Sequence, residues 1–199
     1  MTVEIIDCEQ GSDEWFQCRA GLPTASMFSA ILAKGEGKTR RAYLYKLAAE
    51  IITGEPGESF QSAAMERGKA MEAEARALYE FLADEPLQRV GFLRNGSKGA
   101  SPDSLVGNSG GLEIKTQRAD LLIEALFKNE VPSEHRAQVQ GNLWVSEREW
   151  WDLIIFWPRM PLFRKRVYRD EDYIATLSSE VDRFNAELTD TVERLRKLK

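Results

Sequence analysis

The sequence predicts an α/β fold, a mixed central sheet of about five strands flanked by helices. Three observations indicate it. Stretches with a 3.6-residue apolar period alternate with short strand-like runs. Residues 151–157 form a strongly apolar run, as expected for a strand at the centre of the sheet. The Asn-Ser-Gly-Gly run at residues 108–111 is a turn signal that would fold two short strands into a hairpin.

The N-terminal half is predicted to be mainly helical. Ser12 can cap a short helix that Gly21 ends, because a serine side chain accepts first-turn N–H groups and glycine tolerates the left-handed backbone after a helix. Thr24 is the expected N-cap of a helix over residues 25–32. Residues 34–41 hold two glycines and four cations and are expected to form a mobile basic loop. Helical periodicity returns over residues 42–53 and 61–83.

The C-terminal half supplies most of the predicted sheet. A strand is expected over residues 88–93, before the hairpin, and an edge strand over residues 163–169, where basic and apolar residues alternate. Helices are expected over residues 118–127 and from Ser133 onward. The last helix, residues 171–199, has an apolar stripe and should pack on the body of a single 1–199 domain or on a neighbouring subunit.

Composition limits the function. The 199 residues suffice for one domain with a substantial core, and no apolar run or leader predicts a membrane span or secretion. Cys8 and Cys18 are too few for a disulfide framework or a four-cysteine iron–sulfur site. With His135 as the single histidine, serine-hydrolase triads and zinc-binding histidine clusters are disfavoured. The net charge of −5 requires a DNA enzyme to segregate its charge, and a mixed solvated surface is the alternative.

The residues that indicate chemistry are Asp103, Glu113 and Lys115. Side chains alternate along a strand, so Glu113 and Lys115 point to one face while Ile114 points into the core. The hairpin turn would bring Asp103 alongside Glu113. Carboxylate oxygens suit Mg²⁺ or Mn²⁺, and Lys115 can orient or help deprotonate an attacking water. A Glu/Lys pair on a solvated strand edge is the plainer alternative.

These residues resemble a known nuclease motif, P-D…(D/E)-x-K, with Pro102-Asp103 and Glu113-Ile114-Lys115 as its halves. From about Gly11 to Tyr173 the chain resembles the phage lambda exonuclease (YqaJ-type viral recombinase) family. Further segments match in order: RAGLPTAS at residues 19–26, Arg67-Gly68-Lys69 with Glu72, Ser101-Pro102-Asp103, and AQVQ at residues 137–140 with Trp144.

The resemblance implies a restriction-endonuclease-like core and a Mg²⁺-dependent exonuclease, with Mn²⁺ as an expected substitute. Such an enzyme degrades one strand of duplex DNA from the 5′ end. It releases mononucleotides and leaves 3′ overhangs for recombination by strand annealing. The resemblance also implies a ring-shaped homotrimer, a single-strand annealing protein as partner, and a phage or prophage protein in the cytoplasm of a bacterial host. No membrane association is expected.

The resemblance also assigns residues. Asp103, Glu113 and the Ile114 carbonyl would bind metal, and Lys115, Glu72 and Gln138 would complete the catalytic site. Arg19, Ser26 and Ser101 would seat the 5′-phosphate. Further DNA contacts are expected from Met65, His135, Lys34, Lys38, Arg40 and Arg41.

Plainer interpretations remain for several of these residues. Arg19 and Ser26 can satisfy helix ends, and Met65 can be a core residue. Glu72 can form a surface pair with Arg76. One departure from the family pattern is Asn95, which stands about where some members carry an acid.

Two other functions share the same core. One is a site-specific endonuclease or a junction-cutting enzyme. The other is a non-catalytic DNA-binding or assembly module, which would more typically have lost a carboxylate or the lysine.

Overall fold

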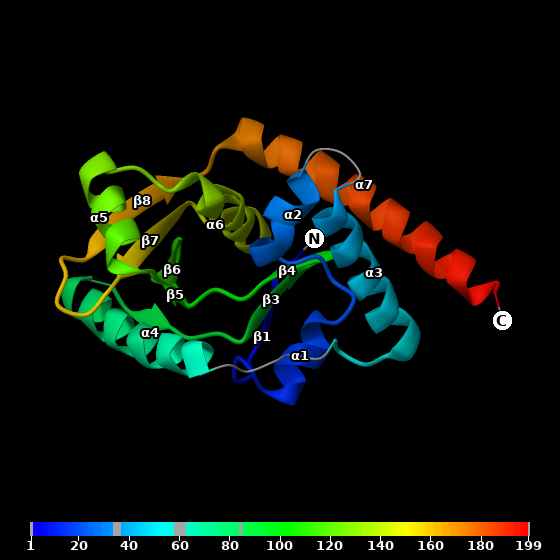
Figure 1. Cartoon of the computed structure of the whole chain (residues 1–199), viewed down its shortest axis with the longest axis horizontal. Helices are drawn as coiled ribbons and strands as arrows, with labels where there is room; N and C mark the ends of the chain where they lie inside the picture. The colour runs from blue at the N-terminus through cyan, green and yellow to red at the C-terminus, as the bar shows by residue number, and fades with distance from the viewer. Residues whose placement is uncertain (1, 34–36, 58–62, 84, 199) are drawn as a thin grey trace.

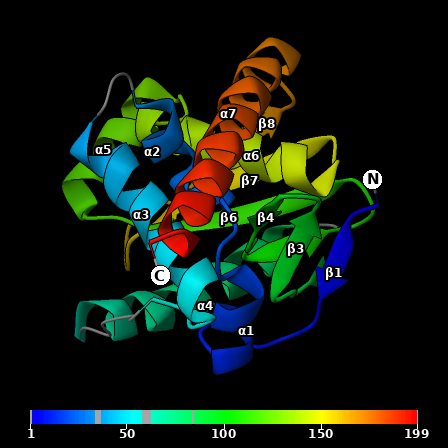
Figure 2. The same ribbon diagram turned by 90° about the vertical axis from the view of Figure 1, so that its right-hand side faces the viewer.

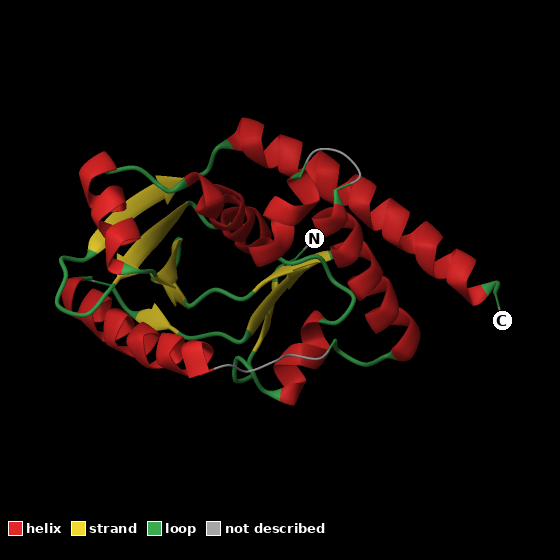
Figure 3. Ribbon diagram, viewed as in Figure 1, coloured by secondary structure: helices red, strands yellow, loops and turns green. Residues whose placement is uncertain are grey.

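A computed structural model describes residues 2–33, 37–57, 63–83 and 85–198 (Figure 1). Helices and short strands alternate along the chain (Figure 3). The elements in order are β1 (Glu4–Ile6), α1 (Asp13–Arg19), the 3-10 turn η1 (Ala25–Met27), α2 (Phe28–Leu32), α3 (Lys38–Thr53), α4 (Ala63–Leu82), β2 (Leu87–Gln88), β3 (Phe92–Asn95), β4 (Lys98–Ala100), β5 (Ser104–Val106), β6 (Gly110–Thr116), α5 (Ala119–Lys128), α6 (Ser133–Ser146), β7 (Trp150–Phe156), β8 (Phe163–Tyr168) and α7 (Glu171–Arg196).

The predicted five-stranded mixed sheet is confirmed. Its order is β2-β5-β6-β7-β8, in which only β6 and β7 run parallel. β7 is buried along its whole length, as its apolar sequence predicted. Its side chains alternate between two apolar clusters, one shared with α6 and one with α4, so a helix covers each face. Within the described ranges, no helix combines the length and apolarity needed to cross a membrane.

The hairpin that carries the predicted chemistry has the expected register. Ser104 of β5 pairs with Leu112 of β6, so the residue before β5, Asp103, lies beside Glu113. The turn is residues 107–109 and not the predicted 108–111, because Gly110 and Gly111 already pair with β5 as part of β6. Gly107 in this turn has a φ of +49°, which favours glycine. β6 continues to Thr116 beyond the end of β5 and stays paired with β7 on its other edge. The edge of β6 that faces β5 is therefore free from Glu113 onward.

A second, three-stranded sheet was not predicted. Its antiparallel order is β1-β3-β4, and it lies beside α1 (Figure 2). The single strand expected over residues 88–93 is instead divided between the two sheets, because β2 belongs to the large sheet and β3 to the small one. This division turns the chain at residues 89–91, next to the candidate site.

Two local predictions near the N-terminus are wrong in part. The basic loop expected over residues 34–41 ends early, because α3 already begins at Lys38; Lys34 lies outside the described residues. The helix expected over residues 25–32 is a 3-10 turn followed by a short α-helix, and the Thr24 side chain makes no capping hydrogen bond. Two short helical pieces bend where one straight helix was expected.

The C-terminal helix α7 packs along α3, with further contacts to α2 and α6 (Figures 1 and 2). Asp170 caps its N-terminus by accepting a hydrogen bond from the Tyr173 N–H at 3.1 Å. The buried apolar stripe on this helix consists of Ile174, Leu177, Val181, Phe184, Leu188 and Val192. Contact with a neighbouring subunit stays a prediction.

A buried aspartate ties the edge strand to the centre of the sheet. Asp152 of β7 is 0% exposed and accepts a hydrogen bond from the Tyr79 hydroxyl at 2.7 Å. It also pairs with Arg164 and Arg166 of β8, which are 35% and 37% exposed. Burial alone raises the pKa of Asp152, but the hydrogen bonds from Arg166 and Tyr79 outweigh it and the pKa lies below its ordinary value. The alternation of basic and apolar residues that predicted this edge strand did not indicate a buried partner for Arg164 and Arg166.

We expect Asp152→Ala to lower the free energy of unfolding by about 3 kcal/mol, because it leaves two clustered guanidinium groups without their counter-charge. Urea denaturation measures the change. Asp120→Ala is the matched control, since Asp120 pairs with Arg118 on the exposed surface and should contribute little. Equal stability of the two variants would show that the Asp152 network is not structural.

Candidate active site

The Asp103 side chain binds the edge of β6 that β5 leaves unpaired. Its carboxylate Oδ2 accepts a hydrogen bond from the Ile114 N–H at 2.5 Å, at the position where β5 no longer supplies a partner. The N–H and C=O of one strand residue point to the same edge, so the Ile114 carbonyl faces the same side as Asp103. The strand register therefore places a carboxylate and a backbone carbonyl together.

Glu113 and Lys115 project from β6 toward α6, as the alternation predicted. The Glu113 Oε1 accepts from the Lys115 Nζ at 2.7 Å and from the Gln138 Nε2 at 2.5 Å, and its Oε2 accepts from the Asn142 Nδ2 at 2.9 Å. The Lys115 Nζ also donates to the Gln138 Oε1 at 3.0 Å. Glu113 is a buried carboxylate that accepts from three donors, and Gln138 links it to the lysine.

The charges of these residues affect one another. The pKa of Asp103 lies well above its ordinary value, because burial and then the neighbouring Glu113 and Glu72 carboxylates disfavour its ionised form. Burial alone lowers the pKa of Lys115, but the Glu113 carboxylate outweighs it, so the pKa of Lys115 is raised. Lys115 is therefore a cation at neutral pH, and the carboxylates repel one another around it.

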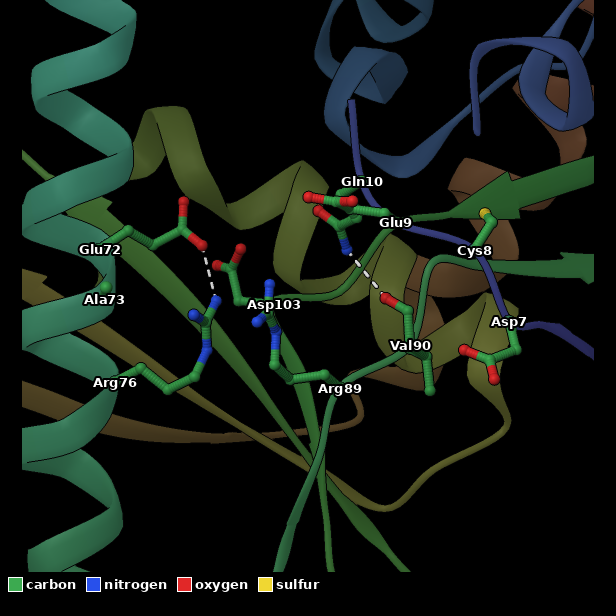
Figure 4. A pocket seen from close by; sticks show the side chains of 10 residues that line it. All are labelled: Asp7, Cys8, Glu9, Gln10, Glu72, Ala73, Arg76, Arg89, Val90 and Asp103. Atoms are coloured by element: carbon green, nitrogen blue, oxygen red, sulfur yellow. Dashed lines mark hydrogen bonds and ion pairs between the residues drawn. The ribbon is translucent and has the colours of Figure 1, made fainter. Parts of the chain in front are cut away.

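Glu72 of α4 lies across a cavity from these strands, as the sequence predicted. The cavity has a volume of about 600 Å³ and is lined by Glu72 and its neighbours on α4, by Asp103, and by residues 7–10 and 89–90. Glu72 pairs with Arg76 one turn later, at 2.6 Å. In Figure 4 the Glu72 and Asp103 carboxylates point toward each other. Glu72 therefore forms the pair with Arg76 that the plainer interpretation expected, and it also lines the cavity beside Asp103; its part in catalysis stays a prediction.

The residues present fit a hard divalent cation. In the ranges that the structure describes, no three His, Cys, Asp or Glu side chains lie close enough to hold a metal alone. The available donors are the Asp103 and Glu113 carboxylates and the Ile114 carbonyl, with Glu72 nearby. Mg²⁺ is typically held by one or two carboxylates, with waters and substrate oxygens completing its shell. The mutual repulsion of these carboxylates is also what a cation would relieve.

Arg19 lines a second, smaller cavity of about 180 Å³ and contacts Ser101. The Arg19 Nη1 donates to the Ser101 Oγ at 2.9 Å, and its guanidinium lies 3.9 Å from the Trp15 ring centroid. Burial lowers the pKa of Arg19. The nearby Glu50 carboxylate accepts instead from the backbone N–H groups of Gly21 and Gly57. Among the described residues, Arg19 thus has no ion-pair partner, and a buried cation in that state favours an anion.

The other predicted DNA contacts are scattered. The exposed Ser26 has its hydroxyl 3.4 Å from that of Thr24. His135 lies 2.7 Å from the Gln117 side chain, on the face of α6 that leads to Gln138. Lys38 and Arg41 are exposed on α3. Neither Lys34 nor the side chain of Met65 is among the described parts.

Arg40 corrects the prediction of a free basic loop. Its guanidinium makes two hydrogen bonds to the Glu187 carboxylate of α7, at 2.6 and 2.9 Å. Its helix packs against α7, so the pair joins two helices. No local pattern indicated this partner, because the two residues are 147 positions apart in the sequence.

Comparisons with known proteins agree with this geometry. The model of the YqaJ-like viral recombinase domain matches residues 14–149. The chain belongs to this family. The match contains the hairpin, Glu72, Gln138, Arg19 and Ser101. A search of curated protein sequences finds no significant match.

Solved structures similar to this member of the YqaJ-like family are exonucleases. LHK-Exo, an alkaline exonuclease from Laribacter hongkongensis, is 32% identical with a TM-score of 0.85, over 94% of this chain and 97% of that chain. The complex of LHK-Exo with dAMP is 33% identical with a TM-score of 0.86, over the same shares of the two chains. A phage related exonuclease from Haemophilus somnus 129PT is 13% identical with a TM-score of 0.66, over 87% of this chain and 96% of that chain, which shows likeness of fold alone.

Two residues that sequence reasoning left unexplained have clear places in this YqaJ-like chain. Asn142 lies one helical turn after Gln138 on α6 and holds Glu113; an i,i+4 pair of amides was the available signal. Asn95 is buried and donates to the Val145 carbonyl and the Glu147 carboxylate, both at 3.0 Å. Asn95 therefore joins β3 to the C-terminal end of α6.

We expect Asn142→Ala to lower the free energy of unfolding by about 2 kcal/mol, because a buried carboxylate oxygen loses its donor. Nuclease activity per folded molecule should also fall, since Glu113 is no longer held. Gln140→Ala is the control on the same helix. The Gln140 side chain bonds the Tyr168 carbonyl and the Asp170 N–H and does not touch Glu113. A stability loss with full activity in both variants would contradict a role for Asn142 at the site.

Proposed function

We propose that this protein is a Mg²⁺-dependent 5′-to-3′ exonuclease of double-stranded DNA that releases mononucleotides. The observation that carries the proposal is the convergence of Asp103, Glu113 and Lys115 at the free edge of β6. The proximity of Arg19 and Ser101 to the same strand end supports a terminal phosphate as the ligand beside it. The dAMP bound by LHK-Exo is consistent with a mononucleotide product.

In the proposed reaction a water oxygen bonds to the scissile phosphorus while the P–O3′ bond breaks, and the O3′ of the released nucleotide takes up a proton. Mg²⁺, when bound by Asp103, Glu113 and the Ile114 carbonyl, supplies Lewis-acid polarisation of the phosphate and activates water. Mn²⁺ is the expected substitute. Glu72 points toward Asp103 across the cavity (Figure 4).

The residues of the chain supply orientation and charge. An ammonium group has three N–H donors, of which Lys115 uses two for Glu113 and Gln138. The third can be donated to the attacking water or to a phosphate oxygen whose charge grows in the transition state. Gln138 fixes the lysine relative to Glu113, so the donor is preorganised. His135, on the same helix face, is positioned to meet the strand being cut.

The 5′ end is proposed to sit on Arg19 and Ser101, with Ser26 from the neighbouring turn. A guanidinium with free N–H groups suits phosphate oxygens, and the terminal phosphate would provide the missing counter-charge. The Trp15 side chain holds this seat by donating to the Ser101 hydroxyl at 3.0 Å and to the Gly91 carbonyl at 3.1 Å. Lys38 and Arg41 remain proposed contacts to the DNA backbone.

The biological setting follows from family membership. We propose that the chain acts as a single exonuclease domain, assembles as a homotrimer around DNA, and works with a single-strand annealing protein. Its 3′ overhangs would serve recombination of a phage or prophage in the host cytoplasm.

We expect EDTA to abolish digestion of linear duplex DNA and added Mg²⁺ or Mn²⁺ to restore it. Lys115→Ala should lower the cleavage rate about 100-fold or more with DNA binding retained, because it removes the preorganised donor. Lys165→Ala, on the outer strand β8, is the control and should cleave at the normal rate. Full activity in EDTA, or in Lys115→Ala, would favour the non-catalytic alternative for these residues.

We expect faster cleavage of a duplex with 5′-phosphate than with 5′-hydroxyl ends, and no cleavage of a covalently closed circle. Arg19→Gln should remove the preference between the two ends, whereas Arg19→Lys should keep part of it. End-labelled duplexes measured in parallel give the ratio. A cleaved circle would instead indicate an endonuclease, and an unchanged ratio in Arg19→Gln would move the phosphate seat elsewhere.

A further inference from the structure

The cavity beside Asp103 contains two arginines that the proposed mechanism does not use. Arg76 comes from α4, and Arg89 comes from the turn between β2 and β3. Figure 4 shows both side chains extending toward the Glu72 and Asp103 carboxylates, so that their guanidinium groups approach the same part of the cavity. Two like charges that converge beside a phosphodiesterase centre need an explanation.

Arg76 is mostly buried and only partly satisfied. Its side chain is 14% exposed and its Nη2 pairs with one Glu72 oxygen at 2.6 Å. The Arg76 Nε is buried and has no hydrogen-bond partner among the residues that the structure describes. A guanidinium has five N–H donors, so this one keeps donor capacity after its pairing with Glu72.

Arg89 is held in place by its backbone. The Gln10 side-chain amide donates to the Val90 carbonyl at 3.0 Å and to the Pro102 carbonyl at 2.8 Å. Val90 follows Arg89, and Pro102 precedes Asp103, so one amide fixes the backbone of the arginine relative to the candidate metal ligand. Within the described ranges the exposed Arg89 side chain forms no ion pair.

None of the described acidic residues that line the cavity is paired with Arg89. Glu72 is taken by Arg76, and Asp103 is a proposed metal ligand. Asp7 and Glu9 line the opposite wall of the cavity (Figure 4), and within the described ranges neither forms an ion pair with Arg89. One planar guanidinium group can donate two parallel hydrogen bonds to two phosphate oxygens, whereas an ammonium group acts as a point charge.

We propose that Arg76 and Arg89 form a second phosphate subsite, distinct from the seat at Arg19, for a phosphate group of the nucleotide chain. The inference rests on the proposed nuclease function and adds to it. The phosphate has two possible sources: a phosphodiester next to the scissile bond, or the phosphate of a released nucleoside monophosphate. Gln10 acts as a positioning residue for this subsite.

The decisive variant is Arg89→Gln, because Arg89 is exposed and its loss should leave the fold intact. Duplex DNA with a 5′-phosphate is bound in Mg²⁺ by protein carrying Lys115→Ala, which slows cleavage, over a series of salt concentrations. If the subsite takes a DNA phosphate, Arg89→Gln lowers the slope of log affinity against log salt by about one and weakens binding roughly tenfold at low salt. Arg89→Lys should keep the slope.

A second measurement distinguishes the source of the phosphate. In the otherwise normal enzyme, dAMP is added as an inhibitor of cleavage. An unchanged salt slope with weaker dAMP inhibition in Arg89→Gln assigns the subsite to the released nucleotide. Arg194→Gln, near the exposed end of α7, is the matched control and should alter neither quantity.

Unchanged salt slope and unchanged dAMP inhibition in Arg89→Gln would overturn the subsite. That failure is separable from failure of the nuclease proposal, in which the unmutated enzyme would not cleave linear duplex at all. Arg76→Gln is a secondary variant, since loss of its bond to Glu72 also affects the neighbouring carboxylates.

Discussion

One hydrogen bond, from the Ile114 N–H to the Asp103 carboxylate, holds the Asp103 side chain against the sheet at the candidate site. It exists because β5 begins at Ser104, opposite Leu112, so the β5 backbone has no partner for the Ile114 N–H. The Asp103 side chain accepts that hydrogen bond instead. Asp103 is therefore fixed by strand register, and the edge of β6 beyond it stays open. Because β5 does not pair with β6 beyond Leu112, this edge of β6 is open to a ligand or substrate.

The two helices that cover the sheet then set the charge of the site. On one face α6 brings Gln138 and Asn142 to Glu113, so both oxygens of this buried carboxylate accept hydrogen bonds from side-chain amides. Toward the cavity α4 brings Glu72, which adds negative charge and raises the pKa of Asp103. On the α6 side the Glu113 carboxylate thus has hydrogen-bond donors, whereas on the α4 side the Glu72 carboxylate repels Asp103. This imbalance suits the binding of a cation more than it suits the stability of the fold.

The anionic net charge of the chain is compatible with a DNA ligand because its cations are placed individually. Arg19 is half-buried against Trp15 and has no ion-pair partner among the described residues, while Arg76 and Arg89 line the cavity beside Asp103. Other arginines are structural: Arg40 pairs with Glu187, and Arg164 and Arg166 share Asp152. Counting charges along the chain cannot separate these groups, because the partner decides whether an arginine is available.

The sequence alone determined the sheet of five strands, the hairpin register, and the shared face of Glu113 and Lys115. These follow from local rules: a side-chain period of two, turn residues at a fixed place, and apolar runs that must be buried. Only the tertiary structure decided the contacts between distant segments. The pairing of Arg40, the clamp by Gln10, the division of residues 88–93 between two sheets and the buried partner of β8 all depend on packing across many tens of residues. No local period encodes such contacts, because they arise from how already formed elements meet.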